Sequence, residues 1–265
     1  MVKDGHIHTP YCPHGSADTL KHYIEQAIRL GYRQMTFTEH APLPPSFTDP
    51  TGDSAMAGRH LEKYFADITR VKEAYKNELT IWTGLEVDYI AGFEEETKAL
   101  LNCCGPLLDD AILSVHFLKP SPEQYICMDA SPDAFEQVIA ATGSLEAVYS
   151  LYYQTVLASI AADLGPYKPK RIGHISLVRK FQTLFPRSFD DEALLYRVLE
   201  RMKQHGYALD VNGAGLAKPY CNEFYPPLHI AKQAGEMGIP LFYGSDAHSA
   251  SDLGRGLEDF LRLEE

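Results

Sequence analysis

Histidine is concentrated near the start of the chain and at a few later points that share one local pattern. Residues 4–18 read DGHIHTPYCPHGSAD and place three histidines within nine residues that include turn-forming proline and threonine. Four further histidines, one glutamate and one aspartate also stand at or just after short apolar runs. The full set is His6, His8, His14, His40, Glu86, His116, His174, Asp246 and His248.

Imidazole together with a few carboxylates is a ligand set for transition metals. Zinc, iron and manganese accept neutral imidazole and carboxylate, whereas calcium and magnesium prefer shells made of oxygen. Nine ligands are too many for one tetrahedral ion, so two or three ions that share a carboxylate fit the set better. Solvated loop histidines are the alternative for any one residue alone. Four other histidines fall in helical patterns and are predicted to be surface or packing residues: His22, His60, His205 and His229.

A centre of several metal ions would favour an anionic substrate. Three divalent ions bring about +6, and Glu86 and Asp246 return only about −2, so a local positive excess would face the solvent. Paired ions also clamp the attacking and leaving oxygens of a phosphoryl group. The expected substrate is therefore a phosphate ester, although the whole chain carries a formal net charge of −12.

The elements that position these residues alternate along the chain. Short runs rich in β-branched and aromatic residues recur between helical patterns, which is the sequence form of βα units. Seven such runs are present, at residues 2–7, 34–38, 79–84, 111–115, 171–175, 207–211 and 239–243. Helices are predicted over 17–30, 59–76, 93–103, 144–164, 190–205 and 227–237.

The reactive residues follow the runs, and this placement predicts the architecture. Catalytic groups of α/β barrels converge at the C-terminal ends of the strands. The chain is expected to form an α/β fold, a distorted TIM-like (β/α)7 barrel with a metal site at the C-terminal ends of its strands, in a single domain over residues 1–265. In the first helix, Ser16 is the expected N-cap and Gly31 the stop.

Two proline-rich loops stand beside the predicted site. Residues 41–58 carry four prolines and two glycines directly after the second run, and a loop of this length in a compact domain is typically functional, here as a lid. The loop at residues 213–227 has a similar make-up and follows the sixth run. Its aromatic residues, which could cover a bound substrate or serve as packing anchors, are Tyr220, Phe224 and Tyr225.

The overall composition restricts the partners. A net charge of −12 and a pI of about 5.4 leave no basic stripe for nucleic acid. Five cysteines without a CxxC pair fit neither a disulfide framework nor a thiolate zinc site, and no apolar run is long enough for a signal peptide or a membrane span. The expected protein is cytoplasmic and binds a small phosphorylated substrate, without nucleic acid or membrane; the sequence leaves its oligomeric state open.

The motifs together resemble those of a known family. They comprise HIH at 6–8, TEHAPLPPSFTDP at 38–50, GLEVDYI at 84–90, SVHFL at 114–118, RIGHISLVRKF at 171–181 and GSDAH at 244–248. This set, which runs nearly from end to end of the chain, is similar to the PHP (polymerase and histidinol phosphatase) superfamily, and more narrowly to its free-standing histidinol-phosphate phosphatases.

The resemblance implies a metal-dependent phosphomonoesterase that hydrolyses L-histidinol phosphate to L-histidinol and phosphate in histidine biosynthesis. It implies three divalent ions of zinc, iron or manganese, with water activated by them as the nucleophile. One ion would take His6, His8, Glu86 and Asp246, a second Glu86, His116 and His174, and a third His14, His40 and His248.

Within this scheme Glu86, Asp246 and His248 are the expected catalytic residues, His248 as one possible proton donor to the leaving alcohol. The turn after the sixth run reads Ala217–Lys218, where related enzymes often carry Arg-Lys. Lys218 and Arg179 are therefore the predicted phosphate contacts, with solvated loop cations as the alternative.

Two other functions remain open at this stage. One is a PHP-type phosphoesterase that acts on nucleotides or DNA 3′ ends, which the acidic charge disfavours. The other is a non-catalytic, metal-binding regulatory domain, which the full ligand set disfavours.

Overall fold

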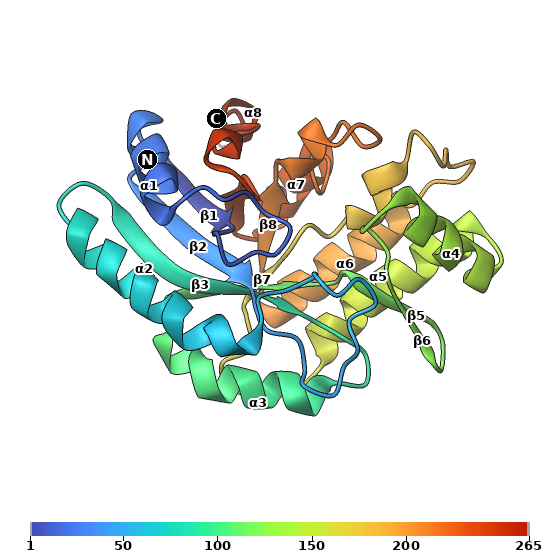
Figure 1. The fold of residues 1–265 in the computed structure, drawn as a ribbon. Helices are drawn as coiled ribbons and strands as arrows, with labels where there is room; N and C mark the ends of the chain where they lie inside the picture. The colour runs from blue at the N-terminus through green and yellow to red at the C-terminus, as the bar shows by residue number, and fades with distance from the viewer. Residues whose placement is uncertain (1, 264–265) are drawn as a thin grey trace.

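Seven parallel strands form one sheet that curves into a barrel (Figure 1). The computed structural model describes residues 2–263. The strand order is β1-β2-β3-β4-β7-β8-β9, so each strand of this sheet lies beside the strand of the same sheet that follows it in the chain. Their bounds are Lys3–Ile7 (β1), Gln34–His40 (β2), Thr80–Asp88 (β3), Asp110–Ser114 (β4), Arg171–Ile172 (β7), Ala208–Asn212 (β8) and Leu241–Gly244 (β9).

The first and last strands meet at a seam that lies beside the predicted ligands. Ile7 and Ala247 form a parallel bridge. The amide of His8 donates to the carbonyl of Ala247 at 3.0 Å, and the amide of Asp246 donates to the carbonyl of His6 at 2.8 Å. The expectation of a distorted seven-stranded barrel is confirmed, because no eighth strand is needed to bring these two edges together.

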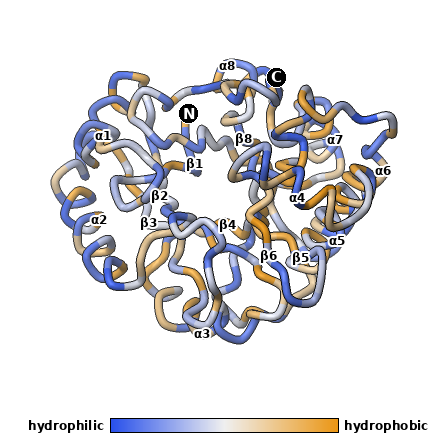
Figure 2. Tube along the Cα trace, turned by 45° about the vertical axis from the view of Figure 1, so that its right-hand side comes forward, coloured by the Kyte–Doolittle hydropathy of each residue, from blue (hydrophilic) through white to orange (hydrophobic). Residues whose placement is uncertain are grey.

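Helices form a ring outside the strands (Figure 2). They span Leu20–Arg29 (α1), Leu61–Tyr75 (α2), Glu94–Cys104 (α3), Pro132–Thr142 (α4), Leu145–Ala161 (α5), Glu192–His205 (α6), Leu228–Glu236 (α7) and Leu257–Leu261 (α8). Short 3₁₀ helices lie at Gly58–His60, Gly105–Leu107, Leu177–Phe181, Ala214–Ala217 and Ala250–Asp252. Among the helices within residues 2–263, none combines the length and apolar character that crossing a bilayer requires.

The apolar core lies between the strands and this ring. Helix α1 buries Leu20, Tyr23, Ile24 and Ala27, which recur at helical spacing, and each large apolar side chain of this kind contributes about 1.5–3 kcal/mol by leaving water. On α2 the hydroxyl of Tyr64 donates to carbonyls of β2 and β3 at 2.9 and 2.7 Å.

All six predicted helices are present, but one start is wrong and two helices were missed. Helix α1 begins at Leu20, and Thr19 rather than Ser16 is its N-cap, with its hydroxyl accepting from the amide of His22 at 3.3 Å. The hydroxyl of Ser16 instead accepts from the amide of Asp18, inside the preceding loop. The missed helices are α4, which lies close before α5, and the short α8.

The seven predicted runs all become strands, with different ends. Strand β3 continues to Asp88, so that Glu86 is a strand residue rather than a residue after the strand. Strand β7 is only two residues long, because the chain bends at His174, whose φ of 23° is outside the strand region.

An antiparallel hairpin that the sequence analysis did not predict follows β4. It consists of β5 (Phe117–Ser121) and β6 (Gln124–Cys127). Prolines in and after its first strand weaken the strand pattern there. The hairpin ends close to the predicted site, because Cys127 and Asp129 line the same cavity as the histidines.

Candidate metal centre

The carboxylate of Glu86 lies among histidines from four different strand ends. Its Oε2 atom is 3.1 Å from His40 Nδ1, 3.4 Å from His6 Nε2 and 3.5 Å from His8 Nε2. The separations from His6 and His8 match those between ligands of one ion, because zinc bonds of about 2.0 Å at a tetrahedral angle hold two ligand atoms roughly 3.3 Å apart.

The second oxygen of Glu86 faces a second pair of histidines. Oε1 lies 2.8 Å from His174 Nε2 and 3.8 Å from His116 Nε2, and it accepts a hydrogen bond from Ser114 Oγ at 2.6 Å. Each oxygen of this carboxylate therefore belongs to a different group of imidazoles, which is the arrangement of a carboxylate that bridges two ions.

Asp246 approaches the same place from the loop after β9. Its Oδ1 is 3.0 Å from His8 Nε2 and 3.7 Å from His6 Nε2. The residue has a φ of 52°, in the left-handed region that only a few per cent of non-glycine residues adopt, and Asn212 of β8 donates to its Oδ2 at 3.1 Å. The backbone is strained where it aims this carboxylate at the histidines of β1.

Three buried carboxylates hold the other ring nitrogen of the histidines. Asp210 Oδ2 is 2.8 Å from His6 Nδ1, and Asp88 Oδ1 is 2.7 Å from His116 Nδ1. Glu39 is 3.4 Å from His8 Nδ1. Such contacts place the proton on Nδ1 and leave Nε2 free as a metal ligand. The sequence analysis missed all three acids; the signal for Asp88 and Asp210 was their position two residues after Glu86 and two before Asn212, on the same side of a strand.

Several buried ring nitrogens make no hydrogen bond within residues 2–263. They are Nε2 of His6, Nε2 of His8, Nδ1 of His40 and Nδ1 of His174. A buried polar atom without a partner costs about 1–3 kcal/mol, so a cluster of them is unfavourable unless something binds there. The donor set of imidazole and carboxylate, with these unpaired nitrogens, fits divalent transition-metal ions.

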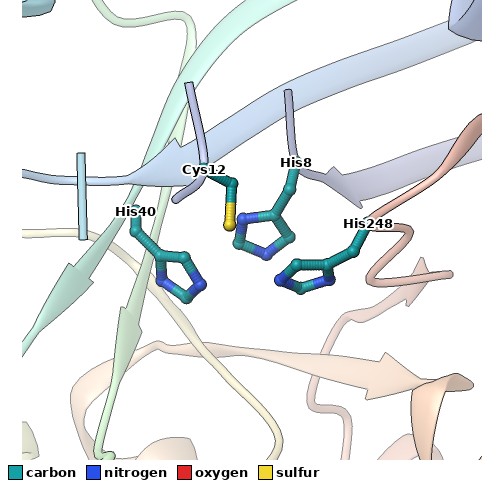
Figure 3. Close-up of side chains that lie close together, drawn as sticks. All are labelled: His8, Cys12, His40 and His248. Carbon is teal, nitrogen blue, oxygen red and sulfur yellow. The ribbon is translucent and has the colours of Figure 1, made fainter. Parts of the chain in front are cut away.

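Cys12 lies beside a third group of histidines, which consists of His8, His40 and His248 (Figure 3). One ligand atom from each of His8, Cys12, His40 and His248 lies within 4.8 Å of the others. The same spacing holds for His6, His8 and Glu86, and for Glu86, His116 and His174, which agree with two of the expected groups. It also holds for His40, Asp88 and His116.

His14 stands slightly apart from this third group. Its Nδ1 is 2.9 Å from the carbonyl of Asp53, and its ring centroid is 5.2 Å from those of His40 and of His248. The structure thus brings eight of the nine predicted ligands into close groups and leaves His14 at their edge, on the wall of the same cavity.

Charges within the centre raise the pKa of three of its histidines, and Asp246 and Asp210 hold that of His6 well above its usual value although burial would lower it. Burial alone would lower the pKa of His8, but the neighbouring carboxylates of Asp246 and Glu39 outweigh burial and raise it to about 9. Burial likewise opposes protonation of His116, yet the carboxylate of Asp88 raises the pKa of this imidazole to about 10.

Other members shift in the opposite direction. Burial would raise the pKa of Glu86 and of Asp246, but the neighbouring imidazoles, His6 foremost, hold both carboxylates well below their usual pKa range. Burial and the positive charge of His8 lower the pKa of His248 well below its usual value. The two acids are therefore ionised at neutral pH.

A cavity of about 320 Å³ opens above the histidines. Residues 51, 53 and 54 of the predicted lid form part of its wall. Two cations also line it. One is Lys218, for which the sequence analysis predicts a contact with phosphate, and the other is Lys180, which the sequence analysis did not single out and whose Nζ is 2.9 Å from Asp129 Oδ2. Tyr225 is buried on the wall, while Tyr220 and Phe224 are not among the lining residues.

The structure places Arg179 elsewhere. Its side chain is buried and forms two hydrogen bonds with Asp191, from Nε at 3.0 Å and from Nη2 at 2.6 Å, and its Nη1 is 3.4 Å from Glu223. The guanidinium is not among the groups that line the cavity. Its contacts are those of an internal ion pair and do not support the predicted contact with phosphate.

Several known proteins are similar to this chain in sequence and fold. The chain is 51% identical to histidinol-phosphatase of Bacillus subtilis, with 98% of each chain covered. A Listeria monocytogenes crystal structure provisionally named histidinol phosphatase is 38% identical, with a TM-score of 0.92, and covers 98% of this chain and 100% of its own.

A Lactococcus lactis histidinol phosphate phosphatase, solved with zinc, L-histidinol and phosphate, is 17% identical. It has a TM-score of 0.71, covers 98% of this chain and 93% of its own, and shows the shared fold. The PHP domain model matches residues 4–214. The chain therefore belongs to the PHP domain family.

Proposed function

We propose that the protein is a metal-dependent phosphomonoesterase that hydrolyses L-histidinol phosphate to L-histidinol and phosphate. One observation carries the proposal: the two oxygens of Glu86 lie within 3.8 Å of five imidazoles, as a carboxylate shared between ions would. The identity with the Bacillus subtilis enzyme supports the substrate.

The centre would hold three divalent ions, and zinc, iron and manganese all suit its ligands. The zinc bound by the Lactococcus lactis relative favours zinc among them. His6, His8, Glu86 and Asp246 would hold the first ion, and Glu86, His116 and His174 the second. For the third we assign His40 and His248 together with His14 from the cavity wall. Such ions polarise phosphoryl oxygens and lower the pKa of water.

The chain's own residues would orient and hold the substrate. Glu86 and Asp246 would act by fixing the positions of the ions. Lys218 would approach the phosphate from the loop after β8, and Lys180 adds a second cation to the same cavity. His248, whose side chain is 26% exposed, lies at the open side of the centre, where it could reach a leaving oxygen. All five cysteines are unpaired thiols, which supports a reducing compartment such as the cytoplasm.

The test is release of phosphate by the purified, metal-loaded protein. We expect L-histidinol phosphate to be hydrolysed with a higher kcat/KM than nucleoside monophosphates or short DNA ending in a 3′-phosphate. A preference for nucleotides would overturn the substrate. Metal analysis showing fewer than two ions per chain, with no phosphatase activity after zinc, iron or manganese is added, would leave a non-catalytic domain.

A substitution of the shared carboxylate tests the centre itself. Loss of a group that merely orients a ligand typically costs 10–100-fold in metal affinity or activity, so Glu86→Gln is expected to lower kcat/KM by at least about 100-fold and to lower the metal content. Glu62→Gln, at an exposed position of α2, is the matched control. Substantial residual activity in Glu86→Gln with full metal content would contradict a carboxylate shared by two ions.

A further inference from the structure

One carboxylate on the cavity wall has no partner. The carboxylate oxygens of Asp53 take part in no hydrogen bond or ion pair within residues 2–263, because in its polar contacts the residue acts only through its backbone. The other acids of the wall are all engaged, with histidines or with a lysine, as described above. The five carboxylates of the cavity are Asp53, Glu86, Asp88, Asp129 and Asp246.

The loop that carries Asp53 is held in place by a second aspartate. Asp49 accepts hydrogen bonds from the amides of Thr51 and Ser54 at 3.0 and 2.9 Å, and from their hydroxyls at 3.0 and 2.8 Å. The carbonyl of Asp53 faces His14 Nδ1 at 2.9 Å, which joins the loop to the edge of the metal centre. The turn is thus held by Asp49 and by His14, and Asp53 is among the residues that line the cavity.

We propose that Asp53 binds the ammonium group of the substrate and so selects phosphate esters of amino alcohols. The inference rests on the proposed function. In L-histidinol phosphate the amine is on the carbon next to the phosphorylated one, so an ammonium lies close to the phosphate. When the metal centre holds the phosphate, the ammonium must find a counter-charge nearby, and a charge-assisted hydrogen bond to a carboxylate supplies it.

Asp53 is the acid that can do this without losing a partner. Recruiting Glu86, Asp88 or Asp246 would take a carboxylate away from a histidine, and recruiting Asp129 would break its contact with Lys180. Asp53 is solvent-exposed in the structure, and the substrate would cover it. The loop after β2 would then bind the amine, and the residues at the strand ends would hold the phosphate.

The experiment compares two substrates that differ only in the amine: L-histidinol phosphate and 3-(imidazol-4-yl)propyl phosphate. The measured quantity is the ratio of their kcat/KM values, which does not depend on how much of a preparation is active. A hydrogen bond to a charged group contributes about 1.5–3 kcal/mol, equivalent to roughly 10- to 100-fold. Asp53→Asn is expected to reduce the ratio by that factor, mainly through a higher KM for L-histidinol phosphate.

Two further variants separate recognition from other effects. Asp53→Glu keeps the charge and is expected to recover part of the ratio. Asp259→Asn, at an exposed position of α8, removes a negative charge that does not line the cavity and is expected to keep the wild-type ratio. A wild-type ratio in Asp53→Asn, including an equal loss on both substrates, would overturn the role of Asp53. Failure of the wild-type protein to hydrolyse L-histidinol phosphate would instead overturn the proposed function.

Discussion

At the scale of single residues, protons and metal ions compete for the histidines of the centre. A histidine binds a metal ion only in its neutral form, whereas without an ion the neighbouring carboxylates raise the pKa of His8 to about 9, that of His116 to about 10 and that of His6 well above its usual value. These imidazoles are therefore protonated at neutral pH until an ion replaces the proton. The acids that attract the ions also attract the protons that compete with them.

Metal binding should release protons, and the sign follows from these shifts. Between about pH 7 and pH 9 the protein without bound ions carries protons on His6, His8 and His116 that the loaded protein lacks, so apparent metal affinity should rise with pH across this window. We expect about three protons released per chain at pH 7.5, measured by titration calorimetry in two buffers of different ionisation enthalpy. No net proton release, or an affinity that falls as pH rises, would contradict the protonated state of these histidines.

At the scale of elements, a ligand at the end of one strand is oriented by an acid from another strand. Asp210 of β8 reaches His6 of β1, and Asp88 of β3 reaches His116 after β4. The ion pair of Arg179 and Asp191 has a structural role instead. It connects the 3₁₀ turn at Leu177–Phe181 to the start of α6, and Tyr153 of α5 donates to the same aspartate at 2.6 Å.

Arg179→Ala should therefore affect stability rather than substrate binding. Breaking a buried ion pair by removing one partner costs about 3–5 kcal/mol, and the remaining contact of Asp191 with Arg187 places the expected loss near the lower end. The free energy of unfolding, from denaturant titration of the metal-loaded protein, should fall by about 3 kcal/mol, with KM for L-histidinol phosphate nearly unchanged.

Lys218→Met is the matched comparison, because this cation lies on the cavity wall and has no such pair within residues 2–263. It should raise KM and leave the free energy of unfolding close to the wild-type value. A large rise in KM for Arg179→Ala with unchanged stability would reverse the two assignments.

The sequence could predict the strand ends because each apolar run is local and its polar successor is adjacent. Glu86 and His116 were found in this way. The partners that neutralise or orient a residue were not predicted, because they do not lie next to it in the chain. Arg179 was identified as a cation, but its pairing with Asp191 was not predicted. Asp53 was not predicted for a similar reason. The sequence of a proline-rich loop does not distinguish a free carboxylate from one that stabilises the loop, such as that of Asp49.

At the scale of the whole molecule, the barrel interior is polar and its closure depends on the seam. Arg171, 2% exposed, donates to the carbonyl of Gly5 at 2.7 Å and to Asp110 at 2.6 Å, and it lies 3.5 Å from Asp210. The upper end of the seam carries ligands from both edges, His6 and His8 on one side and residues 246 and 248 on the other. Ions bound there would link the first strand to the last.

Removal of the metal should therefore lower the thermal stability of the entire barrel. An ion at a hundredfold excess over its Kd contributes about 2.7 kcal/mol, and at this chain length each kcal/mol shifts Tm by about 2 °C. Loss of two or more ions should lower Tm by roughly 10 °C, as measured by calorimetry with and without a chelator, and added zinc should restore it. A Tm that changes by less than about 2 °C would show that the seam holds without the ions.

The seam also sets an order in time for the synthesis of the protein. The amide of Ser245 donates to Asp4 across 241 positions of the chain, and Asp246 and His248 follow at once. A ribosome that adds about 5–20 residues per second needs roughly 10–50 s to cover that distance. Throughout this interval the histidines of β1 and β2 are already made but their partners are not. A nascent chain can hold at most an incomplete centre, and the enzyme acquires its full site only as the last strand leaves the ribosome.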